Sequence, residues 1–164
     1  MRKIKENLEL LNNHSMKNLF VRIAGLLLLF TSCNSVDSKI IREYKKQTEK
    51  MDSCIVNISN IVNFEWDKLY VFKYGAINEN NIPESVNNIL TNSNGFTRKL
   101  IFTLKDSVVY YEEHSIDIEK LKKNEVIFDI PDTAMYKIYP KEKAIFKVSK
   151  KEISVPYYHL QQIE

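Results

Sequence analysis

Residues 99–112 read KLIFTLKDSVVYYE. Two runs rich in β-branched and aromatic residues, 99–104 and 107–112, flank the polar pair Asp106-Ser107. Strands favour such residues, and a short polar connection between two of them favours a tight turn. This stretch therefore predicts a β-hairpin with its turn at Asp106-Ser107.

Further elements are predicted on both sides of the hairpin. Residues 66–73 combine aromatic and β-branched side chains and predict a strand. Pro83 suits a first helical turn, so a helix is expected over residues 82–90. The shorter expected segments are a strand or helical turn at 54–61, a helical turn at 117–123, strands at 126–130 and 144–148, and an edge strand at 153–155. Residues 135–139 are expected to pair with the strand at 144–148.

Most of these strands follow one another through short connections. Such connections favour antiparallel pairing, because parallel neighbours need long crossovers. The expected fold class is therefore α+β: a small antiparallel sheet with one or two helices on one face.

The N-terminal segment has the order of features found in secreted bacterial proteins. Lys17 and Arg22 precede an apolar run of eight residues, 23–30, and two small residues then lead to Cys33. A membrane span needs about 20 residues, whereas the core of a signal peptide has roughly 7–15. The order resembles the lipobox of bacterial lipoproteins. That resemblance implies cleavage before Cys33, diacylation of its sulfur and acylation of its new amino group, for example with palmitate.

The leader divides the chain into three parts. These are a signal peptide at 1–32, the lipidated cysteine with a short polar tether at 33–50, and a single α+β domain at 51–164. The tether can become helical, with its apolar residues on one side. Met1 and Met16 are both open as the start, and Met16 is expected because it begins a typical leader.

Charge limits the kinds of partner. The chain has 24 basic and 21 acidic residues, and residues 33–164 hold 19 of each because five basic and two acidic residues lie in 1–32. Nucleic-acid binding needs a basic patch, so no nucleic-acid partner is expected. If Cys33 is acylated, Cys54 has no disulfide partner and its apolar setting predicts a buried thiol.

The sequence offers few candidate residues for catalysis or for binding a cofactor. The sequence has no nucleophile elbow, HExxH motif or phosphate loop, so neither enzyme activity nor a cofactor or metal is expected. Glu65 and Asp67 flank a tryptophan that could desolvate one of them, which makes them an alternative acid–base pair. Glu112 and His114 share a strand face, but a metal site needs three or four ligands, so a solvated strand end is expected.

Tyrosines supply the expected interaction surface. Tyr110 and Tyr111 are adjacent in a strand, so their rings point to opposite faces. Tyr157 and Tyr158 form a second pair near the C-terminus. Exposed tyrosines are favoured at binding surfaces, which makes these four the candidate interaction residues.

The mature part resembles small lipoproteins of the Bacteroidota type, on the leader, on FEWDKLYVF at 64–72 and on the hairpin around 100–102. This resemblance brings no known activity. We expect a protein anchored by lipid in the inner leaflet of the outer membrane, facing the periplasm. It would present a small non-catalytic binding domain to a protein partner. An immunity or inhibitor protein against an envelope toxin or hydrolase is one alternative, and a small envelope enzyme using Glu65 and Asp67 is another.

Overall fold

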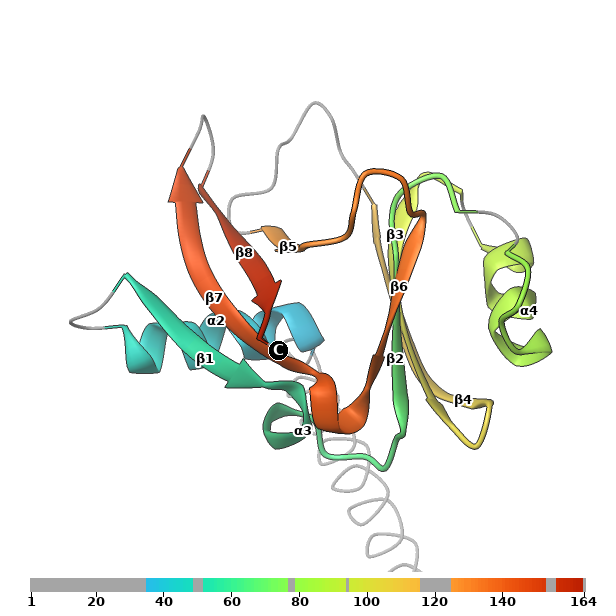
Figure 1. Cartoon of the computed structure of the whole chain (residues 1–164), viewed down its shortest axis with the longest axis horizontal. Helices are drawn as coiled ribbons and strands as arrows, with labels where there is room; N and C mark the ends of the chain where they lie inside the picture. Colours follow the sequence, from blue (N-terminus) through green and yellow to red (C-terminus); the bar gives the residue numbers. More distant parts are fainter. Residues whose placement is uncertain are drawn as a thin grey trace, which may run out of the picture. The chain divides into compact units, whose positions relative to one another are not determined.

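Two four-stranded β-sheets form the framework of the computed structural model (Figure 1). The model describes residues 35–48, 52–76, 79–93, 95–115, 125–152 and 156–163. The expected leader with Cys33, the helical turn at 117–123 and the edge strand at 153–155 lie outside the described residues.

The strands are ordered β1-β7-β8-β5 in one sheet and β4-β3-β2-β6 in the other. Every neighbouring pair is antiparallel except β5 and β8, which are parallel. In chain order the elements are α2 (Val36–Gln47), β1 (Ser53–Asn57), α3 (Ile58–Ile61), β2 (Lys68–Phe72), α4 (Glu84–Asn92), β3 (Thr97–Leu104), β4 (Ser107–Ser115), β5 (Glu125–Phe128), β6 (Tyr136–Pro140), the 3₁₀ helix η1 (Lys141–Lys143), β7 (Ile145–Glu152) and β8 (Pro156–Gln162).

The β4-β3-β2-β6 sheet is covered on both faces. From β2, Leu69 and Val71 enter a core shared with α2 and the other sheet, whereas Tyr70 and Phe72 enter a second core under α4. Figure 1 shows α4 on the outer face of this sheet. Both faces of β2 and β3 are covered, so nearly every residue of these strands is buried and the burial does not alternate along them.

The β1-β7-β8-β5 sheet buries one face. In β7, Phe146 and Val148 are buried in the shared core, and Lys147 between them is exposed. This alternation is the pattern of an antiparallel sheet with one solvated face. The α+β class predicted from the sequence is confirmed, with two small sheets in place of the single expected one.

One predicted strand pairing is wrong. Residues 135–139 were expected to pair with 144–148, but β6 pairs with β2, and β7 pairs with β1 and β8. The short helix η1 between them carries the chain from one sheet to the other. Strands that are close in sequence often pair, but β6 and β7 belong to different sheets and η1 forms the corner between them.

The predicted β3–β4 hairpin is confirmed, and its turn lies one residue earlier than expected. Lys105 and Asp106 have φ values of 50° and 62°. Two consecutive positive φ angles suit the twist of a tight hairpin. The Asp67 carboxylate accepts hydrogen bonds from the Lys105 backbone N–H at 2.7 Å and the Thr103 hydroxyl at 3.2 Å, so it stabilises this turn.

Residues 36–47 of the expected tether at 33–50 are helical and form α2. The Ser35 side chain caps the helix by accepting a hydrogen bond from the Ser38 backbone N–H. Val36, Ile40 and Tyr44 are buried in the shared core, one helical turn apart. The segment is therefore part of the domain.

We predict that Ile40→Ala lowers the free energy of unfolding by about 2–5 kcal/mol, because Ile40 is fully buried and its truncation leaves a cavity. Equilibrium urea unfolding, followed by the fluorescence of the single tryptophan, measures this change. The matched control is Lys45→Ala on the exposed side of the same helix, with an expected effect within about 0.5 kcal/mol. Equal stabilities of the two variants would show that α2 does not pack in the core.

Candidate functional site

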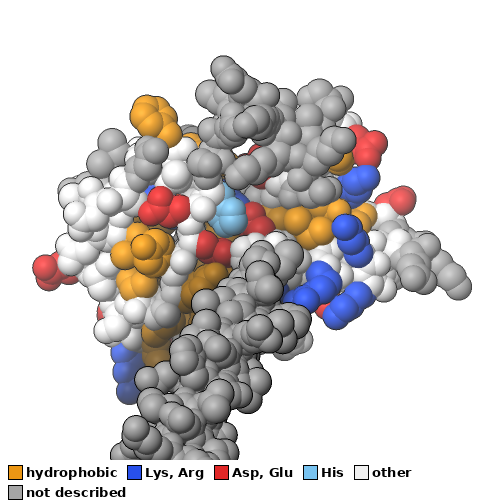
Figure 2. Space-filling view, turned by 180° about the vertical axis from the view of Figure 1, so that it is seen from behind, with side chains coloured by type: hydrophobic (Ala, Val, Ile, Leu, Met, Phe, Trp, Pro, Cys, Tyr) orange, Lys and Arg blue, Asp and Glu red, His pale blue; other side chains and the backbone are white. Residues whose placement is uncertain are grey.

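Three charged side chains and a histidine, from α2, β3 and β4, meet at the start of α2. Arg98 of β3 lies directly opposite His114 of β4, and Leu100 lies opposite Glu112. Residues in these registered positions share one sheet face, which is the face that buries Leu100 in the core. Asp37, in the first turn of α2, completes the cluster. Figure 2 shows histidine and acidic side chains side by side at the surface.

The centre of this cluster is an ion pair. Arg98 Nη2 donates to Asp37 Oδ2 at 2.5 Å, and the two side chains are only 6% and 13% exposed. His114 Nδ1 lies 3.5 Å from the same carboxylate oxygen. The Arg98 guanidinium also lies 5.8 Å from the centre of the Phe128 ring, a cation–π distance.

Glu112 attaches the start of α2 to β4. Its two carboxylate oxygens accept from the Val36 backbone N–H at 2.7 and 3.1 Å, and Oε2 also accepts from the Tyr110 hydroxyl at 3.3 Å. The first N–H groups of a helix have no partner inside it and carry a partial positive charge. A carboxylate at this point therefore stabilises the helix as well as fastening it.

Burial raises the pKa of the Asp37 carboxyl above its ordinary value, and the nearby Glu112 carboxylate acts in the same direction. The Arg98 guanidinium and His114 oppose this rise. The cluster therefore depends on Arg98, because a buried carboxylate without a cation is costly.

The cluster also contains polar atoms without hydrogen bonds. Within the described ranges, Asp37 Oδ1, Arg98 Nε and Nη1, and His114 Nε2 are buried and have no hydrogen-bond partner, although His114 Nε2 lies 3.9 Å from Glu112 Oε2. Such atoms lose their hydration without compensation. The cluster is therefore a sensitive part of the structure, in which the removal of one charge affects the others.

A metal ion is one possible occupant of this cluster. The donor atoms of Asp37, Glu112 and His114 lie within 4.8 Å of one another, and zinc accepts such ligands. However, the Arg98 cation already lies on Asp37, and the Val36 N–H already lies on Glu112. A metal ion would have to displace both. The geometry fits an ion-pair network that fastens α2 better than it fits a metal centre.

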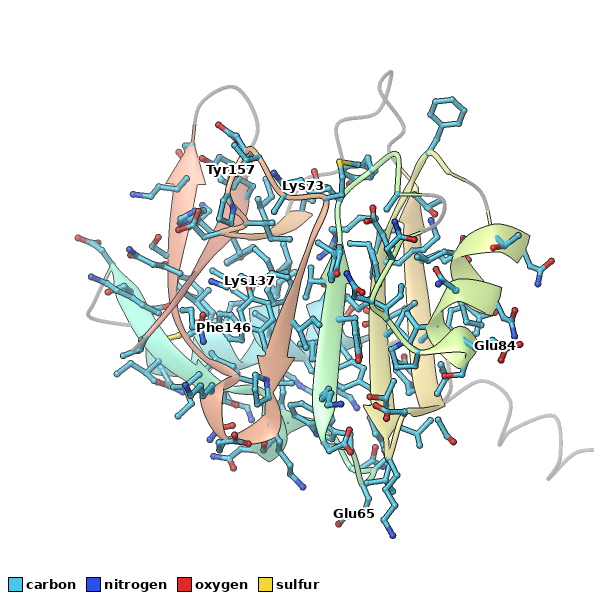
Figure 3. The ribbon with its side chains drawn as sticks, turned by 45° about the vertical axis from the view of Figure 1, so that its right-hand side comes forward. Glu65, Lys73, Glu84, Lys137, Phe146 and Tyr157 are labelled. Atoms are coloured by element: carbon cyan, nitrogen blue, oxygen red, sulfur yellow. The ribbon has the colours of Figure 1, made fainter. Side chains whose placement is uncertain are left out.

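The alternative acid–base pair does not converge on a shared site. Glu65 has a side chain that is 84% exposed and lies 3.4 Å from Lys141, and Figure 3 shows it pointing outward at one end of the domain. Asp67 is engaged by the β3–β4 turn. Trp66 between them is buried against Phe102, at 5.2 Å between ring centres. Glu65 is therefore solvated and Asp67 is bound to the turn, so the two carboxylates do not share a desolvated cavity.

An open groove of about 850 Å³ lies between the start of α4, β2 and β6. No sequence pattern indicated it, because its walls come from four separate parts of the chain. Lys68 Nζ lies 2.9 Å from Asp106 Oδ1, so one basic side chain of the groove is already paired. The groove combines apolar residues, which include Tyr70, Ile82 and Ile138, with an acidic rim formed by Glu84, Asp106 and Glu142.

The four candidate tyrosines do not form one surface. Tyr158 is buried edge-on against Tyr44, at 5.0 Å between ring centres. Tyr110 packs on the shared core, whereas its neighbour Tyr111 is 48% exposed, in agreement with the expected alternation. Tyr157 is half-buried on the other sheet, where Figure 3 labels it.

Two further reactive side chains are buried. Cys54 is a free buried thiol, as expected, and burial raises its pKa so that the unreactive neutral form is favoured. Lys99 is fully buried on the α4 side of β3, and burial lowers the pKa of its amine. Neither side chain is accessible to a substrate in this conformation.

Comparisons with known proteins do not identify a family for this chain. No family model, curated protein or solved structure matches the chain. Among the described residues, no helix is long and apolar enough to cross a membrane.

We predict that Arg98→Met destabilises the domain by about 3–5 kcal/mol at neutral pH, because Asp37 then remains buried without a cation. The double variant Asp37→Asn with Arg98→Met removes both charges and is expected to be more stable than Arg98→Met alone. Urea unfolding of the wild type and the two variants measures these differences in stability.

The exposed ion pair Lys150–Glu152, at 2.7 Å, is the control, and removal of either charge there should leave the stability close to that of the wild type, because solvent screens this pair. If the double variant is no more stable than Arg98→Met, the ion pair is not the interaction that holds the cluster.

Proposed function

We propose that this protein is a lipid-anchored envelope lipoprotein of the Bacteroidota type that binds a cationic segment of a partner protein in the groove between α4, β2 and β6. The groove is the observation that carries the binding part of the proposal. The leader and Cys33 support the anchor, and the proposed location is the periplasmic side of the outer membrane.

The chemistry of the groove indicates the class of partner. Apolar residues such as Ile82 and Ile138 can bury the aliphatic part of a ligand, and the exposed Glu84 and Glu142 can pair with lysine or arginine. Complementary charge guides the encounter and disfavours acidic partners. A basic, partly apolar peptide segment fits these surroundings better than a nucleic acid or an acidic substrate does.

The contacts of Asp67 favour binding over the enzyme alternative. This carboxylate lines the groove, but its two oxygens accept hydrogen bonds from Thr103 and Lys105. These two hydrogen bonds give Asp67 a structural role at the β3–β4 turn. Inhibition of an envelope toxin or hydrolase is a special case of the binding proposal, in which the bound segment belongs to that enzyme.

The anchor is tested by the intact mass of the protein from bacterial membranes. We predict a mass equal to residues 33–164 plus acyl chains, because the leader resembles a lipobox. Cys33→Ser is expected to lose both cleavage and acylation. A mass that retains the leader without acyl chains would contradict the anchor.

The groove is tested by a photo-crosslinking residue at Ser85, on its wall, and by the same residue at Asp132, outside it. We expect a discrete crosslinked partner from Ser85 only. The double variant Glu84→Lys with Glu142→Lys should weaken binding of that purified partner at least about tenfold, since loss of about 1.4 kcal/mol is sufficient.

The matched control is Asp132→Lys with Glu152→Lys, which changes the net charge equally at exposed positions away from the groove. Its affinity should remain close to that of the wild type. Equal losses in both double variants would indicate a general charge effect and contradict the groove as the binding site.

A further inference from the structure

Only two residues, Asn34 and Ser35, separate Cys33 from the first core residue of the domain. Consecutive Cα atoms are 3.8 Å apart, so the Cα atoms of Cys33 and Val36 can be separated by about 11 Å at most. This limit holds for any conformation of the connecting residues. A lipid attached to Cys33 would therefore hold the start of α2 close to the membrane surface.

The first turn of α2 is fixed to the domain and cannot lengthen the connection to Cys33 without unpacking. Val36 is 1% exposed, and its backbone N–H is bound by the Glu112 carboxylate. Ile40 and Tyr44 continue the buried side of the helix, and Asp37 is paired with Arg98. Release of α2 to serve as a tether would expose these apolar side chains and separate a buried ion pair.

We infer that the domain rests directly on the lipid surface, with the first turn of α2 and the C-terminal end of β4 against the phospholipid headgroups. This inference rests on the proposed acylation of Cys33. It gives the proposed lipoprotein a defined orientation in place of a mobile tethered domain.

Among the charges at this end, the cations of α2 suit an anionic phospholipid surface, whereas the exposed Glu113 of β4 does not. Glu112 and Asp37 are directed into the cluster, where the start of α2 and Arg98 compensate them. Lys39 and Arg42 lie on the less buried side of α2, within two turns of Val36. Cations close to anionic headgroups are attracted to them, whereas uncompensated carboxylates would be repelled.

The proposed binding groove lies toward the other end of β4. Asp106, on its rim, is six residues before Glu112, which corresponds to about 20 Å along an extended strand. Anchoring at the start of α2 therefore leaves the groove accessible to a partner in the periplasm.

The orientation is tested with acylated protein purified from membranes and reconstituted in vesicles of phosphatidylethanolamine and phosphatidylglycerol. One fluorophore is attached through Lys39→Cys, near the anchor, or through Ser107→Cys, near the groove; Cys54 is buried and does not compete. A spin-labelled headgroup quenches by contact. We expect several-fold stronger quenching at position 39 than at position 107.

The control inserts twelve Gly/Ser residues after Asn34 in the same labelled proteins, which gives a flexible linker of about 19 Å on average. Quenching at position 39 should then fall to the level at position 107. Equal quenching at the two positions without the linker, or quenching at 39 that the linker leaves unchanged, would overturn the inference while acylation stands. A protein without acyl chains would overturn the proposed anchor, and this inference with it.

Discussion

The attachment of α2 to the β3–β4 hairpin is the interaction on which the rest of the structure depends. It combines the buried Asp37–Arg98 ion pair with the Glu112 carboxylate on the Val36 N–H. These contacts position the helix so that Ile40 enters the core between the two sheets. Each contact is polar and poorly hydrated, so each depends on the others for charge compensation.

A second carboxylate organises the opposite end of the hairpin. Asp67 holds the Lys105–Asp106 turn, where two residues adopt positive φ angles. The same turn contributes Asp106 to the rim of the groove. The hairpin therefore connects the charged cluster with the groove: its open end holds α2, and its turn borders the groove. We propose that these ends serve anchoring and binding respectively.

The cluster and the groove escaped sequence-based prediction for a physical reason. Glu112 and His114 were recognised as sharing a strand face, but their partners Asp37 and Arg98 lie far along the chain or on the paired strand. Local periodicity reports which face a residue occupies and contains no information on which element covers that face. The position of Arg98 just before an apolar run was the one sequence feature that could have indicated the cluster. It was not informative, because a charged residue at the start of a strand is usually solvated.

The sequence by itself determined the α+β class, the β3–β4 hairpin, β2 and α4, because alternation, β-branched content and turn residues act over a few neighbouring positions. Only the tertiary structure decided that the strands form two sheets, that η1 is a corner, and that residues 36–47 are a core helix. Those outcomes depend on which apolar faces meet, and residues 36–47 have few apolar side chains, all on one side. Their burial is favourable only because they pack against residues of both sheets and because Arg98 compensates the charge of Asp37.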